Sequence, residues 1–193
     1  LAFAAMQNII DPAILFFVLG VFSGIVRSNL EIPPAISRFL SLYLLMALGL
    51  KRGEKLAVWA TNVPYWVALQ FATAKIGAVL ITVNTNYREH ELRYLLTHSE
   101  CENIFLIDSV RDHDYLDTLY RIAPELRLQS RDRLVCKSLP HLKRVCFLGA
   151  EKHRGMYSLP ELFSLAGDVS DEEYESRKAS ISPYDVVNMQ YTS

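Results

Sequence analysis

From Lys51 onward, short apolar runs alternate with amphipathic stretches. This alternation is typical of β-α-β units, in which parallel strands form a sheet covered by helices. The runs are rich in valine, isoleucine and leucine and are short enough to be buried strands. The predicted strands are 55–60, 78–83, 103–108, 144–149 and 185–190. The sequence therefore predicts an α/β fold for this part of the chain.

Helices are predicted between these strands. Asn62 is placed to cap the first helix, Pro64 fits its first turn, and Gly77 ends it. A second helix is predicted over 88–99, a third is led by Pro160, and the acidic stretch 171–178 follows. The residues that share one face of the 88–99 helix are Leu92, Leu95 and Leu96. Residues 111–143 are rich in charge, and no element is assigned to them.

Residues 1–50 have a different composition and carry four charged side chains, Asp11, Arg27, Glu31 and Arg38. Two apolar runs flank the Pro33-Pro34 pair, and Gly20 and Gly24 form a GxxxG pattern that permits close helix packing. A short membrane hairpin is the preferred interpretation, with buried helices of a soluble core as the alternative. A secretory signal is disfavoured because no basic residue precedes Arg27.

The remaining bulk properties exclude several classes of function. The net charge of −1 gives no electrostatic basis for a nucleic-acid partner. The three cysteines form no CxxC pair, so they are interpreted as reduced thiols of a cytoplasmic protein. The five histidines have no HExxH spacing, and no metal site is expected. His90 and His98 could share a helical face, but we interpret them as solvent-exposed.

Residues 9–51, IIDPAILFFVLGVFSGIVRSNLEIPPAISRFLSLYLLMALGLK, resemble the start of the sodium-dependent bicarbonate transporter (permease) family. The resemblance implies an opening helix, a link around Pro33-Pro34, and a second helix. Fewer than two helices of a many-helix transporter would be present. Transport needs a complete pathway between helices, so this segment is not expected to transport.

Residues 49–100 resemble the AMP-forming acyl-CoA synthetases of the adenylate-forming superfamily, in particular the medium- and long-chain fatty-acid ligases. The match runs through a "G-L-x-x-G-D-x-V-A-I" opening and a "K-x-G-A-x-x-x-x-N-x-x-Y-R-x-x-E-L-x-Y-x-L-x-x-S" block. Tyr65 departs from the pattern, because many relatives have Glu there. The residues in register are Lys75, Gly77, Ala78, Asn84, Tyr87, Arg88, Glu91, Leu92, Tyr94 and Ser99.

The final residues, DVVNMQYTS, resemble the strand that leads into the family's "Y-T-S-G-T-T-G-x-P-K-G" phosphate loop. By this resemblance, Thr192 and Ser193 bind the phosphates of ATP, and the intact enzyme uses ATP, Mg²⁺ and CoA on a fatty or other carboxylic acid. The family's later motifs have no counterpart in these 193 residues. The chain is therefore expected to be an inactive N-terminal fragment, and no residue is assigned as catalytic.

Four of the matched residues, Asn84, Tyr87, Arg88 and Glu91, are expected to satisfy backbone groups at a strand-to-helix turn rather than to react. The two resemblances meet at a seam near Met46–Arg52. The predicted organisation is an apolar helical segment, 1–50, with membrane association through it. An incomplete parallel-sheet subdomain, 51–193, follows. A membrane-anchored ligase and a transporter-derived or non-enzymatic chimeric remnant remain alternatives.

Overall fold

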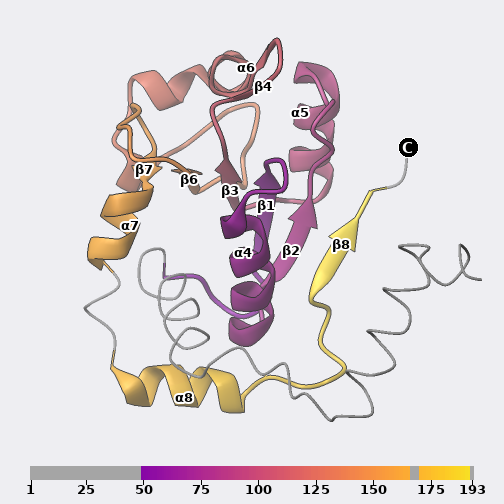
Figure 1. Cartoon of the computed structure of the whole chain (residues 1–193), viewed down its shortest axis with the longest axis vertical. Coiled ribbons are helices and arrows are strands. Elements are labelled where there is room, and N and C mark those ends of the chain that lie inside the picture. The colour runs from indigo at the N-terminus through magenta and orange to yellow at the C-terminus, as the bar shows by residue number, and fades with distance from the viewer. Residues whose placement is uncertain (1–48, 166–169, 192–193) are drawn as a thin grey trace, which may run out of the picture. The chain divides into compact units, whose positions relative to one another are not determined.

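The computed structural model describes residues 49–165 and 170–191, which form one mixed α/β body (Figure 1). The first five elements are β1 (Lys55–Trp59), α4 (Pro64–Ile76), β2 (Val79–Thr82), α5 (Glu89–His98) and β3 (Asn103–Leu106). Next come β4 (Ser109–Val110), β5 (His113–Asp114), α6 (Tyr115–Ile122) and two 3₁₀ turns, η1 (Pro124–Arg127) and η2 (Arg131–Arg133). The last are β6 (Arg144–Phe147), β7 (Tyr157–Ser158), α7 (Leu159–Leu165), α8 (Asp171–Ala179) and β8 (Asn188–Gln190).

The main sheet has six strands in the order β7-β6-β3-β1-β2-β8, and every pair is parallel. The predicted parallel sheet is thus confirmed, with each long strand within a few residues of its predicted bounds. β8 lies beside β2, although the chain reaches it from β7 at the opposite edge (Figure 1). Because every pair is parallel, the carboxyl ends of all six strands lie along one side of the sheet, which we call the carboxyl edge.

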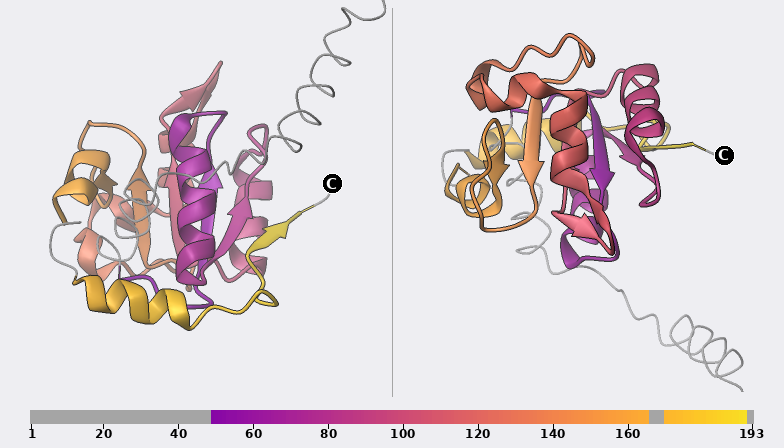
Figure 2. Two further views of the ribbon diagram at one scale, coloured as in Figure 1. Left: turned by 60° about the horizontal axis from the view of Figure 1, so that its bottom comes forward. Right: turned by 90° about the horizontal axis from the view of Figure 1, so that it is seen from above.

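Helices cover both faces of this sheet (Figure 2). Alternate strand residues point to opposite faces, because successive side chains of a strand alternate. In β1, Leu56 and Val58 pack in the core beneath α4, α7 and α8. Ala57 and Trp59 pack in the core beneath α5 and α6. A sheet buried on both faces explains why its strands read as continuous apolar runs.

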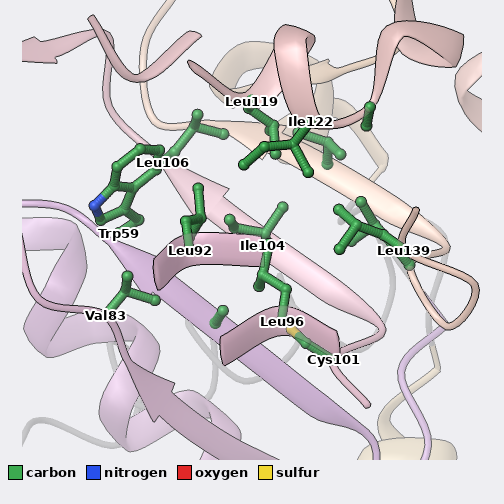
Figure 3. Close-up of a cluster of buried hydrophobic side chains, with 14 of the residues drawn as sticks. Trp59, Val83, Leu92, Leu96, Cys101, Ile104, Leu106, Leu119, Ile122 and Leu139 are labelled. Carbon is green, nitrogen blue, oxygen red and sulfur yellow. The ribbon is translucent and has the colours of Figure 1, made fainter. Parts of the chain in front are cut away.

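The core beneath α5 and α6 gathers apolar side chains from strands and helices that are distant in sequence (Figure 3). The predicted face of α5 is confirmed, since Leu92, Leu95 and Leu96 are its buried residues. Trp59 is fully buried, and its indole stacks on the ring of Tyr115 with centroids 3.7 Å apart. This face therefore holds α5 rigidly against the sheet.

The first predicted helix is confirmed in extent but not in its cap. Pro64 occupies the first turn of α4, and Gly77 ends it with a φ of 72°. The N-cap is Val63, which makes no side-chain cap bond, so the assignment of this role to Asn62 is wrong. Pro64 fixes its own φ and lacks an N–H, which reduces the need for a capping side chain.

The charged segment that received no prediction, 111–143, contains β5, α6 and both 3₁₀ turns. Asp114 caps α6 by accepting a hydrogen bond from the Asp117 N–H at 2.7 Å. Cys101, Cys136 and Cys146 are free and buried, as expected of reduced thiols. Burial raises the pKa of the Cys101 thiol to about 12, so it is unreactive at neutral pH.

The membrane hairpin predicted for residues 1–50 lies almost entirely outside the described residues, which begin at 49. Within residues 49–165 and 170–191, no helix has both the length and the apolar character needed to cross a bilayer.

Candidate functional site

Parallel sheets covered on both faces bind ligands at the carboxyl ends of their strands. In this chain the carboxyl edge is formed by the residues that follow β1, β2, β3, β6, β7 and β8 (Figure 1). Two of these segments match the family motifs seen in the sequence: the turn from β2 to α5, and the residues after β8. The candidate site is therefore built from these two segments, which lie on neighbouring strands.

The turn from β2 to α5 is held by its own polar side chains. The Asn84 side chain accepts a hydrogen bond from the Asn86 N–H at 2.9 Å. The Glu91 carboxylate accepts from the Arg88 N–H at 3.2 Å, as an N-terminal helix residue commonly does. Tyr115 ties the turn to α6 by donating its hydroxyl to the Thr85 carbonyl at 2.7 Å. Asn84 and Glu91 therefore satisfy backbone groups at this turn, as predicted.

The end of β8 is tied to the C-terminal turn of α5. The hydroxyl of Tyr191 lies 3.1 Å from Nδ1 of His98, and the two rings meet edge-on with centroids 5.9 Å apart. The ring of Tyr94 stacks on the imidazole of His98, with centroids 5.3 Å apart. Burial raises the pKa of the Tyr191 hydroxyl, so the phenol stays protonated at neutral pH.

A cavity of about 360 Å³ opens between α5 and Tyr191. Its lining is mainly aromatic and apolar: Tyr87, His90, Glu91, Tyr94, Leu95 and Tyr191. The carboxylate of Glu91 is already engaged in capping α5. The cavity thus offers aromatic surface beside the residue that precedes Thr192, and it offers few free charged groups.

A second cavity, of about 320 Å³, lies at the carboxyl ends of β3 and β6. Ile107, Phe147 and Leu148 form apolar walls, and Asp108 and Glu151 add acidic groups. In the sheet order, β1 and β2 separate these strands from β8. This cavity is therefore on the same edge as the candidate site but apart from Tyr191.

A third cavity, of about 430 Å³, lies by the start of β6, on the side of the sheet where the strands begin. Two of its cationic residues form close ion pairs: Arg131 with Glu161 at 2.8 Å, and Lys143 with Glu102 at 2.7 Å. The Ser158 N–H, and then Arg131, lower the pKa of Glu161 to about 2. We interpret this cavity as part of a structural network of ion pairs.

The predicted phosphate-binding residues, Thr192 and Ser193, lie outside the described residues, so their assignment stays a prediction. In the described ranges, no group of three potential metal-ligating side chains comes together. His90 and His98 are both exposed, as predicted, but the contact of His98 with Tyr191 was not predicted. No local pattern signals a contact between residues 93 positions apart.

Comparisons with known proteins agree on one family. A family model described as AMP-binding enzyme matches residues 36–193. The putative acyl-CoA synthetase YngI of Bacillus subtilis (strain 168) is 44% identical over 149 residues, which are 77% of this chain and 27% of that protein. The acyl-CoA ligase SID4 of Ajellomyces capsulatus is 34% identical over 151 residues, covering 77% of this chain and 24% of the ligase.

The fold also matches a solved structure. The coronafacic acid ligase of Pectobacterium brasiliense has a TM-score of 0.58 and 17% identity, over 81% of this chain and 27% of that chain. At this identity the likeness shows the fold alone.

The chain spans about a quarter of the length of the curated relatives it matches. The family match reaches back to residue 36, which is N-terminal of the predicted seam near Met46–Arg52. These homologues are acyl-CoA ligases, and they give no support to the transporter resemblance of residues 9–51. The match covers most of the chain, including every described element. The chain therefore belongs to the AMP-binding enzyme family.

Proposed function

We propose that residues 49–193 are part of the AMP-binding domain of an ATP-dependent acyl-CoA ligase that acts on a fatty acid. The observation that carries this proposal is the position of β8. It pairs with β2 and brings Tyr191, the first residue of the Tyr-Thr-Ser motif, to the carboxyl edge of a parallel sheet. Backbone N–H groups and hydroxyls at such an edge suit the phosphates of a nucleotide.

The proposed reaction has two steps. An oxygen of the fatty-acid carboxylate attacks the α-phosphorus of ATP, an acyl–phosphate bond forms, and the bond to pyrophosphate breaks. The thiol of CoA then attacks the acyl carbonyl, a thioester forms, and AMP leaves. Such reactions depend on positioning and on stabilisation of charge.

Within this reaction, the described residues act as a scaffold. The two cores hold β2 and β8 in register, and α5 supports the end of β8 through His98 and Tyr191. Thr192 and Ser193 would hold phosphate oxygens of ATP. Mg²⁺ would neutralise phosphate charge when bound, but the described residues offer no cluster of ligands for it. We therefore expect the 193 residues by themselves to catalyse no ATP–pyrophosphate exchange.

A chimera tests the proposal directly. Residues 49–193 replace the corresponding segment of YngI, whose own activity with ATP, CoA and a series of fatty acids is measured first. The proposal expects a folded chimera that forms acyl-CoA at a rate within about tenfold of the parent. A chimera that melts cooperatively but forms no acyl-adenylate would count against it.

A matched pair of substitutions makes the test specific. In the active chimera, Thr192→Ala and Ser193→Ala should each weaken ATP–pyrophosphate exchange, because each removes a phosphate-binding hydroxyl. Losing one hydrogen bond to a charged group costs about 1.5–3 kcal/mol, or roughly 10- to 150-fold. Thr97→Ala, which removes an exposed hydroxyl on α5, serves as the control and should leave exchange unchanged. Equal rates in all three variants would argue against the assigned role of Thr192 and Ser193.

A further inference from the structure

We propose that His98 is a positioning residue for ATP: through Tyr191 it fixes the end of β8, from which the chain continues into Thr192 and Ser193. This inference rests on the proposed function. It assigns a role to a histidine of α5 that neither the residue pattern nor the family motif singles out.

β8 is held weakly by its backbone. It has three residues, and among the described strands it pairs with β2 alone. The residues just before it, Val186 and Val187, are 64% and 44% exposed. A short edge strand of this kind opens readily, because few buried contacts and few ladder hydrogen bonds oppose its local unfolding. Side-chain contacts at its end therefore have a large relative effect on its position.

The contact at the end of β8 comes from a rigid element. Leu92, Leu95 and Leu96 fix α5 in the core, and His98 lies outside this buried face, where its side chain is exposed. The imidazole is oriented by Tyr94, one helical turn earlier, whose ring stacks on it at an interplanar angle of 19°. With its proton on Nε2, the neutral imidazole presents Nδ1 as an acceptor for the Tyr191 hydroxyl.

Tyr191 is also held on its apolar side. Met189 and Tyr191 both pack against the core beneath α5 and α6. The phenol is thus fixed at its ring by packing and at its oxygen by α5. An error of about 1 Å in the position of a binding group can cost on the order of 100-fold in rate.

The first test measures the contact in the 193-residue chain, without any assumption about activity. Amide hydrogen exchange of β8 is compared with that of β1 and β3 in His98→Ala and Tyr191→Phe. Loss of one hydrogen bond predicts about fivefold faster exchange in β8 and no change in the central strands. His98→Asn should restore most of the protection, because its amide oxygen can accept from Tyr191 at a place close to Nδ1.

Tyr184→Phe is the matched control for removal of the Tyr191 hydroxyl. Tyr184 is 95% exposed and lies just before β8, so this substitution should leave β8 exchange unchanged. If amide exchange of β8 were unchanged in both His98→Ala and Tyr191→Phe, the proposal would be overturned, because the contact would not stabilise β8.

The second test measures positioning of ATP in the active chimera. His98→Ala and Tyr191→Phe should raise the KM for ATP about fivefold or more, with the KM for the fatty acid unchanged, and His98→Asn should reverse most of the effect. A merely structural loss would instead lower the active fraction and leave both KM values alone.

The outcomes separate the two proposals. A chimera that melts cooperatively but is inactive before any substitution at His98 overturns the proposed function and, with it, the positioning role. An active chimera whose KM for ATP is the same with His98 and with His98→Ala overturns the positioning role and leaves the proposed function standing.

Discussion

One guanidinium nitrogen of Arg52 donates to both carboxylate oxygens of Asp185, at 2.6 and 2.8 Å, although the two residues are 133 positions apart. Arg52 lies in the turn before β1, and Asp185 lies in the turn before β8. The same carboxylate accepts a hydrogen bond from the Ser182 N–H at 2.9 Å. β8 is therefore tied at its beginning to the turn before β1 and at its end to α5.

This geometry predicts the titration of Asp185. The Ser182 N–H, and then Arg52, hold the pKa of the Asp185 carboxyl below its usual range. Arg52→Ala should raise this pKa part of the way towards the value of a free aspartate, because the Ser182 bond remains. Carboxyl NMR shifts followed from pH 6 to pH 2 would measure it. The sign is fixed: the favourable contacts of the carboxylate are complete above the unfolded pKa of about 3.9 and are lost as pH falls through the lower folded value.

Arg93→Ala is the control for this titration, because Arg93 pairs with Glu89 within α5. It should leave the pKa of Asp185 where it was. If Arg52→Ala also left it unchanged, the Arg52–Asp185 contact would be absent in solution.

We expect replacement of Trp59 to lower the stability of the fold strongly. It is fully buried at the end of β1, and it packs on both Tyr115 and His113. Trp59→Ala should lower the free energy of unfolding by about 3–5 kcal/mol, the usual cost of emptying a large aromatic site. Trp59→Phe should cost clearly less, because the indole N–H has no hydrogen-bond partner to lose. Urea unfolding followed by circular dichroism measures both, and equal losses would show that ring volume is unimportant here.

The burial of His113 predicts that the stability of the fold depends on pH. It is buried, its Nε2 lies 3.1 Å from the Thr118 hydroxyl, and its Nδ1 has no hydrogen-bond partner. Burial, and then the charge of Arg88, lower the pKa of His113 below 6.5. Near pH 6 the unfolded chain therefore binds more protons than the folded one. The contribution of His113 is complete above the unfolded pKa and is lost as pH falls through the lower folded value.

Stability should thus decrease from pH 7 to pH 5, by at most about 1.4 kcal/mol per pH unit from this one group. The slope is measured by urea unfolding at several pH values. His113→Asn should flatten it, whereas the exposed His141→Asn should not. An unchanged slope in His113→Asn would assign the pH dependence to other groups.

Two glycines form a matched pair for backbone strain. Gly155 and Gly53 both have positive φ, 73° and 83°. A Cβ on Gly155 would lie 2.3 Å from the Leu126 carbonyl oxygen, whereas a Cβ on Gly53 would meet nothing within 4 Å. Gly53→Ala should cost about 1–2 kcal/mol for the left-handed backbone alone. Gly155→Ala should cost more, because η1 must also move, and thermal melts of the two variants would compare them.

Local chemistry allowed much of the fold to be predicted. The strands could be placed because buried parallel strands read as short apolar runs. Gly77 ends α4 because it tolerates the left-handed conformation there. α6 was missed, although Asp114 and the spacing of Tyr115, Leu119 and Ile122 contain a helix signal. The helix has only two turns, and the many charged residues around it make its apolar periodicity hard to recognise.

The candidate site was only half determined in this way. The Tyr-Thr-Ser motif and the turn at Asn84 are local patterns, so the sequence by itself determined the family and the alternation of strands and helices. The binding of phosphate by Thr192 and Ser193 stays a prediction. Only the tertiary structure decided that β8 lies beside β2 and that Tyr191 meets His98. Strand order and contacts across 93 residues depend on how whole faces pack together, and no periodicity of 2 or 3.6 residues carries that information.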